Sequence, residues 1–294
     1  MTDDITLTRY GLFRRTSKRR IDLAYDSEEA EVDVFHRLAQ FLKAEVMLDI
    51  GANIGLYCIN ALSIPEIKRV VAVEASSETY AELSANLALQ NTDQVIEAHN
   101  IAASTEERVM RFYEYGSMAG HNGLVDTSFV GERLDHAVVE VAARPMDLVV
   151  PQRGEVLAVK IDVEGHECEV LDGARDLLAG ATGFLQIEIV SDANVTEVTD
   201  RLSALGYDPV GFIKCDHYYL HRSLADQADA VRKIMFDAIK ASLASLLELR
   251  RMRRSALRAA RKVGPAAAPV TQVDRFARDP VMGGKARGKL GASE

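Results

Sequence analysis

The chain contains no Trp, and only three Cys and seven Pro occur among its 294 residues. Cys58, Cys168 and Cys215 are too few and too scattered for a disulfide framework or a zinc site built from paired cysteines. No stretch approaches the ~18 uncharged apolar residues that are needed to cross a bilayer. The N-terminal residues also lack the apolar core of a signal peptide. We therefore expect a protein of the reducing cytoplasm.

The net charge of the chain is −9, but the charged residues are unevenly distributed along it. From Arg232 onward, 15 Lys and Arg residues stand against five Asp and Glu residues, which gives this segment a charge of +10. The 231 residues before it hold 20 Lys and Arg against 39 Asp and Glu, a charge of −19. Because an acidic surface repels phosphates, the composition argues against nucleic acid as a substrate or partner.

The pattern of apolar residues predicts an alternation of strands and helices. Short apolar runs predict strands over 46–50, 70–73, 95–102, 156–161 and 184–190. Helical spacing predicts helices over 28–43, 56–62, 79–90, 166–179 and 195–205, and a closing hairpin is expected over 207–213 and 217–221. This alternation predicts an α/β fold, with a mostly parallel sheet covered on both faces. The functional site is expected at the edge where the carboxyl ends of the strands meet.

We divide the chain into four parts on composition. Residues 1–30 are predicted to be a polar, solvated extension, with a cover over a substrate cleft as the alternative. Residues 31–222 form the α/β domain, although 103–155 lack clear periodicity and are expected to be a long irregular insertion. Residues 223–263 are a basic helical extension. Residues 264–294, rich in Ala, Gly, Pro, Lys and Arg, are predicted to be a disordered tail.

A glycine-containing turn, DIGANIG over 49–55, follows the first strand of the alternation. Glycines where a strand gives way to a helix let a ligand press on the backbone, although a simple chain reversal needs them too. Glu74 ends the next strand, where an acid can accept two hydrogen bonds from ribose hydroxyls. NAD and S-adenosylmethionine both contain ribose. The spacing here differs from the G-x-G-x-x-G of dinucleotide sites and favours S-adenosylmethionine, with Asp49 a candidate acceptor for its ammonium group through water.

Three titratable residues, Asp162, Glu164 and His166, follow the strand over 156–161 at alternate positions. Adjacent like charges repel one another, so such a cluster favours a catalytic role over a purely structural one. The alternative is a solvated acidic loop at a helix start. Glu188 lies in an apolar strand. It either faces solvent beyond the strand pairing or joins Asp162 in holding a divalent metal ion.

The segments VMLDIGANIGLY, VVAVEAS and LAVKIDVEGHECEVLDGA resemble the FkbM family of S-adenosylmethionine-dependent methyltransferases. The resemblance implies a class I methyltransferase fold, Rossmann-like, with a seven-stranded sheet whose last strand is antiparallel. The cofactor roles would fall on Asp49, Gly51, Asn53, Gly55 and Glu74. The roles at the acceptor would fall on Asp162, Glu164 and His166. Family acceptors are most often hydroxyls, on sugars of glycolipids and polysaccharides or on polyketide natural products.

Methyl transfer to a hydroxyl requires in-line alignment and a group that removes the hydroxyl proton. Asp162, Glu164 or His166 would be that base, and the ordinary pKa of His166 suits neutral pH best. A divalent ion held by Asp162 and Glu188 would lower the pKa of the hydroxyl instead. The segment 113–124, with His121 and Asn122, would close over the acceptor or be a flexible surface loop. The rival functions are an NAD-linked oxidoreductase and a non-catalytic scaffold.

The segment 231–262 lacks Pro and Gly and predicts a long helix with one apolar stripe and a basic second half. Three uses are open: self-association into a homo-oligomer, peripheral contact with anionic lipid, and docking to a partner protein. The lack of Trp weakens the lipid interpretation. The acidic remainder of the chain complements a basic segment in a second copy, so self-association is favoured.

Overall fold

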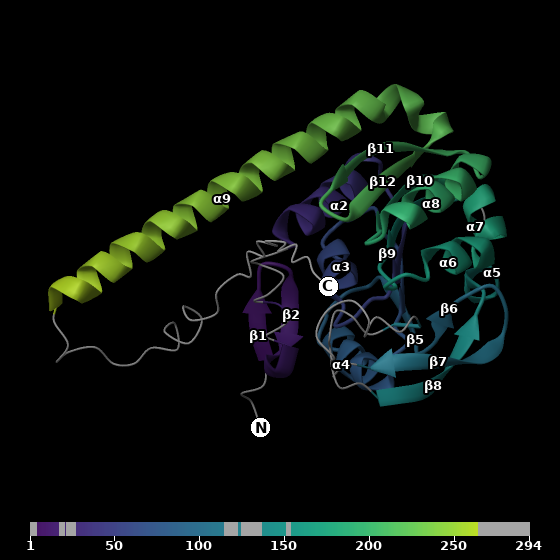
Figure 1. Ribbon diagram of the computed structural model, residues 1–294, viewed down its shortest axis with the longest axis horizontal. Helices are drawn as coiled ribbons and strands as arrows, with labels where there is room; N and C mark the ends of the chain where they lie inside the picture. Colours follow the sequence, from purple (N-terminus) through teal and green to yellow (C-terminus); the bar gives the residue numbers. More distant parts are fainter. Residues whose placement is uncertain are drawn as a thin grey trace, which may run out of the picture. The chain divides into compact units, whose positions relative to one another are not determined.

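The computed structural model describes residues 5–17, 21, 28–114, 123–124, 137–150 and 154–263 (Figure 1). The chain divides into two units, residues 1–242 and 243–294. The predicted disordered tail over 264–294 lies outside the described residues. No helix in the described part of the chain combines the length and apolarity needed to cross a membrane.

A seven-stranded sheet forms the centre of the first unit (Figure 1). In spatial order its strands are β11 (Tyr207–Ile213), β12 (Asp216–His221), β10 (Thr182–Glu188), β9 (Val156–Ile161), β3 (Val46–Ile50), β4 (Arg69–Val73) and β5 (Val95–His99). The strand β12 is antiparallel to both its neighbours, and the other pairs are parallel. The predicted α/β fold, with a mostly parallel sheet and an antiparallel last strand, is confirmed.

Two layers of helices cover the sheet because successive strand residues point to opposite faces. Met47 and Ala158 belong to the core on one face, whereas Leu48 and Val159 belong to the core on the other. The first core is completed by α2 (Glu29–Phe41), α3 (Leu56–Ala61), α4 (Ser77–Leu87) and the start of α9 (Ala228–Val263). The second is completed by α5 (Met146–Val149), α6 (Glu167–Gly173), α7 (Arg175–Ala179) and α8 (Asp192–Ala204).

The single helix predicted over 166–179 is broken into α6 and α7. Ala174, between them, has a non-helical φ of −113°. Gly173 lies so close to another segment that an added Cβ would be 2.0 Å from the carbonyl oxygen of Ser104. The periodicity of the segment does not reveal this contact, because Ser104 belongs to a distant part of the chain.

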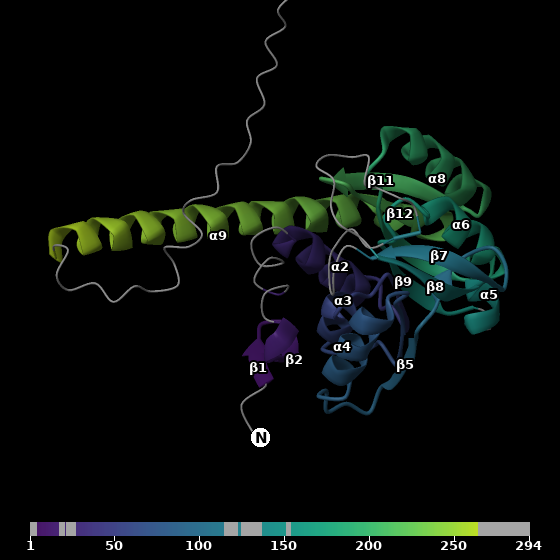
Figure 2. The same ribbon diagram turned by 60° about the horizontal axis from the view of Figure 1, so that its bottom comes forward.

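The region 103–155 was expected to be irregular, and that expectation was wrong for the part that the structure describes. The strands β6 (Ala102–Ala103), β7 (Arg108–Glu114) and β8 (Ala137–Arg144) form a three-stranded sheet in the order β6-β8-β7. Figure 2 shows β7 and β8 running side by side. Phe112, Val141 and Ala143 are buried and pack together in this three-stranded sheet. In the segment 113–124, His121 and Asn122 lie outside the described residues.

The N-terminal segment is more ordered than a solvated extension. The strands β1 (Ile5–Thr8) and β2 (Gly11–Arg14) form a hairpin, followed by the short helix η1 (Arg15–Ser17). Phe13 is fully buried in the main core. The backbone N–H of Arg14 donates to Asn86 at 2.8 Å, and its guanidinium donates to Glu82 at 3.0 Å. The described part of this segment is therefore attached to α4.

The long C-terminal helix was predicted over 231–262 and is observed as α9 over 228–263. Val231, Met235 and Ala238 lie in the core of the first unit. Phe236, Ile239 and Leu243 are exposed, with 60%, 38% and 56% of their surface accessible. The beginning of α9 is therefore part of the first unit. Further along the helix, apolar side chains are exposed.

Candidate active site

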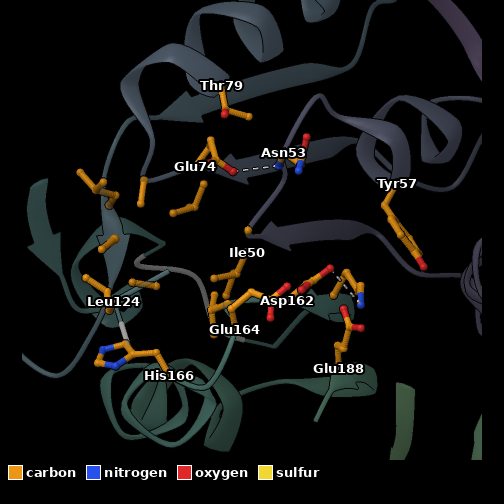
Figure 3. A pocket seen from close by; sticks show the side chains of 18 of the residues that line it. Ile50, Asn53, Tyr57, Glu74, Thr79, Leu124, Asp162, Glu164, His166 and Glu188 are labelled. Carbon is orange, nitrogen blue, oxygen red and sulfur yellow. Dashed lines mark hydrogen bonds and ion pairs between the residues drawn. The ribbon is translucent and has the colours of Figure 1, made fainter. Parts of the chain in front are cut away.

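A pocket of about 280 Å³ lies where β3, β4, β9 and β10 end (Figure 3). Its apolar wall includes Ile101, Ala103, Phe112 and Leu124. Its acidic lining residues are Glu28, Glu74, Asp162, Glu164, Glu188 and Asp216, and among the described residues Lys160 is the only lysine or arginine that lines it. The sheet edge predicted from the strand alternation thus contains a strongly acidic pocket.

The glycine turn brings two strand ends into close contact. Gly51 has a φ of +84°, and a Cβ added there would lie 1.8 Å from the carbonyl oxygen of Asp162. Gly55 has a φ of +92°, and its Cβ would lie 2.8 Å from Leu83 Cδ1. Left-handed backbone together with close packing makes glycine necessary at both positions. Asn53 also has a positive φ, in the left-handed region that asparagine adopts more readily than most other residues.

Glu74 joins this turn to the end of β4. Its carboxylate accepts hydrogen bonds from the backbone N–H groups of Asn53 and Ser76, each at 2.9 Å. The side chain lines the pocket, and burial raises its pKa to about 7, although both hydrogen bonds oppose that rise. Asn53 Oδ1 is buried, and no described residue donates a hydrogen bond to it. Two polar groups at this end of the pocket can therefore accept further hydrogen bonds.

Asp49 lies beneath the turn. Its carboxylate accepts the backbone N–H of Cys58 at 3.0 Å and so stabilises the N-terminus of α3. Burial raises its pKa to about 6. Asp49 does not line the main pocket but borders a small adjacent recess with Gly51 and Asn53. Its contact with a cofactor ammonium group stays a prediction.

Asp162 and Glu188 meet at the opposite side of the pocket from Glu74 (Figure 3). Their side chains lie close enough to interact electrostatically. The negative charge of Asp162, followed by burial, raises the pKa of Glu188 to about 9. The raised pKa favours the protonated form of Glu188 near neutral pH. Glu188 does not simply face solvent; it belongs to the site.

A buried lysine lies under this carboxyl pair. The ammonium of Lys160 is 2.7 Å from Asp216 Oδ1 and 3.8 Å from Asp162 Oδ2. Burial opposes its charge, but the negative charges of Asp216 and Asp162 raise its pKa above the ordinary value. Gln186 Nε2 donates to Asp216 at 2.8 Å and to the hydroxyl of Tyr57 at 3.1 Å. Lys160, Asp216, Gln186 and Tyr57 form a connected polar network at one side of the pocket.

Sequence reasoning missed Lys160, Gln186, Asp216 and Tyr57 as members of the site. A usable signal existed, because Lys160 and Gln186 are polar residues within otherwise apolar strands and must find partners when buried. Lys160 is the register partner of both Asp49 on β3 and Gln186 on β10. The same-face alignment across three strands becomes visible only when the register is known.

Glu164 and His166 line the same pocket. Glu164 has a positive φ of 54°, and burial, then the charge of Asp162, raises its pKa to about 8. The imidazole of His166 is buried, with Nε2 3.1 Å from Ser104 Oγ and Nδ1 3.5 Å from Glu169 Oε2. Burial lowers its pKa below the ordinary value. The three residues predicted after β9 are thus brought to one wall, and the ring nitrogens of His166 already have polar neighbours.

In the part of the chain that the structure describes, no group of three His, Cys, Asp or Glu side chains is arranged to hold a metal ion. Asp162 and Glu188 are adjacent, as the metal hypothesis requires, but the Lys160 ammonium already stands 3.8 Å from Asp162. Metal binding by this pair stays a prediction.

A family model described as the Methyltransferase FkbM domain matches residues 49–209, more than half of the chain. The chain belongs to the FkbM methyltransferase family. The predicted family is confirmed, and with it the class of enzyme, a methyltransferase dependent on S-adenosylmethionine. The matched region begins at Asp49 and includes Glu74, Asp162, Glu164, His166 and Glu188.

Three proteins illustrate what this chain is similar to. "Methyltransferase 1" of Beauveria bassiana (strain ARSEF 2860) is 25% identical over 173 residues, which cover 53% of this chain and 69% of that protein. The crystal structure of Methyltransferase FkbM from Methylobacillus flagellatus KT is 19% identical, with a TM-score of 0.45, and the match covers 61% of this chain and 44% of that one. The chain thus spans less than half of that FkbM protein. The sugar N-methyltransferase KedS8 from Streptoalloteichus sp ATCC 53650 is 12% identical, with a TM-score of 0.36 and coverage of 69% and 92%.

Proposed function

We propose that this FkbM family member transfers a methyl group from S-adenosylmethionine to a hydroxyl, most favourably of a sugar in a glycolipid, polysaccharide or related glycan. The observation that carries the proposal is the placement of Asp162 and Glu188 in the same pocket as Glu74 and the glycine turn. A carboxylate at that position can remove a hydroxyl proton in the step that forms the ether. A hydroxyl of a polyketide-type product is the second candidate acceptor, because the same chemistry applies.

The residues at one end of the pocket fit the cofactor. Glu74 has lone pairs left to accept the ribose hydroxyls. Asn53 Oδ1, which has no partner in the described part of the chain, can accept one more donor. Because Gly51 has no Cβ, the backbone of the turn can pack against Asp162 and line the pocket. S-adenosylmethionine supplies a methyl group on a positively charged sulfur, and a pocket rich in carboxylates favours that charge.

The other end of the pocket suits an uncharged polyol. Asp162 and Glu188 can accept hydrogen bonds from neighbouring hydroxyls, and the phenol of Tyr57 borders the same space. Lys160 is engaged with Asp216 at 2.7 Å, so it offers little to an anionic acceptor. The ionised members of the six acidic lining residues would repel phosphates and carboxylates. These features support a neutral sugar hydroxyl as the nucleophile. Asp162, beside the Lys160 ammonium, would be the group that accepts its proton.

The test is methyl transfer from isotope-labelled S-adenosylmethionine into a total glycan and lipid extract. We expect label in a sugar methyl ether that survives mild alkali, since methyl esters are cleaved under those conditions. Asp162→Asn is the matched negative control, because it keeps the shape of the side chain but removes the base. Label found only in alkali-labile esters or on nitrogen would contradict transfer to a hydroxyl. Cofactor binding without any transfer would favour the scaffold interpretation.

A further inference from the structure

The acidic residue Glu28 borders two cavities that meet at the glycine turn. It lines the main pocket and also the small recess that Asp49, Gly51 and Asn53 border. Tyr57 lines both cavities as well. Burial chiefly raises the pKa of the Tyr57 hydroxyl, and the negative charge of Glu28 adds to this effect. Glu28 precedes the region that the family model matches, so the family resemblance gives it no role.

The position of Glu28 is set by the helix that follows it. The helix α2 begins at Glu29 and carries Phe35, whose buried ring has its centroid 5.5 Å from that of Tyr57 and 5.1 Å from that of Phe184. The side chain of Glu28 makes no capping hydrogen bond to α2. The contact of Phe35 with Tyr57 holds α2 against α3, which keeps Glu28 at the wall that the two cavities share.

The other acids at the recess are already engaged. The carboxylate of Asp49 accepts the backbone N–H of Cys58 at 3.0 Å, and only 1% of the surface of Asp49 is exposed. Asp162 also borders both cavities, but the Lys160 ammonium is 3.8 Å from its carboxylate. Glu28 is half-buried and borders both cavities. It is therefore the acid best placed to bind a cation that enters the recess from the pocket.

We propose that Glu28 binds the ammonium group of the methionine part of S-adenosylmethionine. The ribose and the amino-acid chain of the donor are attached to the same sulfur, so a ribose held at Glu74 directs the amino acid to another part of the pocket. The recess beside the glycine turn is such a place. A carboxylate there pairs with an ammonium group through charge-assisted hydrogen bonds. The inference concerns the donor alone and holds whichever acceptor is methylated.

The experiment compares three probes by calorimetry of the full-length protein. The first is S-adenosylhomocysteine, the second is its deaminated analogue with hydrogen in place of the ammonium group, and the third is 5′-methylthioadenosine, which lacks the amino-acid chain. The wild-type protein should bind the first about 10–100-fold more tightly than the second, the range for a hydrogen bond to a charged group. Glu28→Gln should lose most of this preference, because a neutral amide does not form an ion pair with the ammonium.

The nucleoside end of the site provides internal controls. Glu28→Gln should bind 5′-methylthioadenosine as the wild-type protein does, because that probe carries no ammonium group. Glu74→Ala should weaken binding of all three probes and keep the preference, because each probe contains the ribose. Glu29→Gln is the matched control variant. It removes an acid one residue further along, which pairs with Arg9 and is not among the residues that line either cavity, so the preference should be retained.

Three results would overturn the inference. The first is retention of the full preference in Glu28→Gln. The second is an equal loss of preference in Glu29→Gln, which would indicate a general effect of negative charge. The third is weaker binding of 5′-methylthioadenosine by Glu28→Gln, to the same extent as for S-adenosylhomocysteine. None of these contradicts the proposed function, whose own failure would appear as absent ether product. Circular dichroism of each variant confirms that the fold is kept.

Discussion

The backbone N–H of Asn53 donates to the carboxylate of Glu74 at 2.9 Å, across 21 residues of chain. This bond fixes the turn after β3 against the end of β4. The same carboxylate accepts the N–H of Ser76, so its orientation is set before any ligand arrives. A group held in this way loses little conformational entropy on binding, which favours tight recognition.

Glu74→Ala should weaken binding of S-adenosylmethionine by about 1.5–3 kcal/mol, the range for hydrogen bonds to a charged group. The fold should persist, because the side chain lies at a strand end. Isothermal calorimetry measures the affinity, and Glu78→Ala, at an exposed position of α4, is the matched control. Unchanged affinity in Glu74→Ala would remove Glu74 from the cofactor site.

Asp162→Asn should lower the turnover number by roughly 10²–10⁴-fold, the usual contribution of a general base, with a much smaller loss of donor affinity. His166→Ala tests the other predicted base. Its pKa is lowered by burial and its ring nitrogens contact Ser104 and Glu169, so we expect a smaller effect on turnover. Turnover in a chelator separates a protein base from a metal ion, since full activity there would contradict the metal hypothesis.

The free energy of unfolding should fall as the pH rises from about 5 to about 9. Burial raises the pKa of Asp49 to about 6 and that of Glu74 to about 7, and the pKa of Glu188 rises to about 9 chiefly through the charge of Asp162. A carboxyl whose pKa is higher in the folded than in the unfolded state stabilises the fold. This stabilisation is fully present at a pH below the unfolded-state pKa and is lost as the pH rises through the folded-state pKa. Chemical denaturation at several pH values measures this. Glu188→Gln should flatten the alkaline part of the curve, and a stability that increases with pH would contradict the assignment.

Gly51→Ala should destabilise the fold and abolish tight donor binding. Its Cβ would lie 1.8 Å from the Asp162 carbonyl oxygen, and its φ of +84° is unfavourable for alanine. Backbone strain should cost about 1–3 kcal/mol, and overpacking against Asp162 should add a cost of similar size. Gly154→Ala is the matched control, with a φ of +93° but no atom of the described residues within 4 Å of its Cβ. The difference between the two variants in denaturation isolates the close contact, and equal losses would show that only backbone strain matters.

A chain ending at Ser242 should keep the fold and donor binding but form a smaller assembly than the full chain. It retains Val231, Met235 and Ala238 in the core and removes the segment from Leu243, whose side chain is 56% exposed. A chain ending at Ala230 should be destabilised, because it loses those three buried residues. Light scattering measures the assembly. A monomeric full-length protein that binds anionic vesicles would favour the lipid interpretation of the C-terminal helix.

The sequence by itself determined the order and most bounds of the elements around the pocket. The strands over 46–50 and 156–161 were predicted at the bounds that β3 and β9 show. Local information suffices there, because a continuous apolar run that stops at a glycine or an acid is typical of a buried parallel strand. The positions of Gly51, Glu74 and Asp162 at strand ends followed from the same alternation.

Only the tertiary structure decided which of these side chains meet. Asp162 and Glu188 are separated along the chain, and their contact depends on the register that pairs Ile187 with Ile161. The partnership of Lys160 with Asp216 depends on the antiparallel placement of β12. Phe13 became a core residue because β2 packs near α4, which no local periodicity encodes. Hydrophobic patterning specifies elements and faces, whereas ion pairing and pKa shifts arise from distances between residues far apart in sequence.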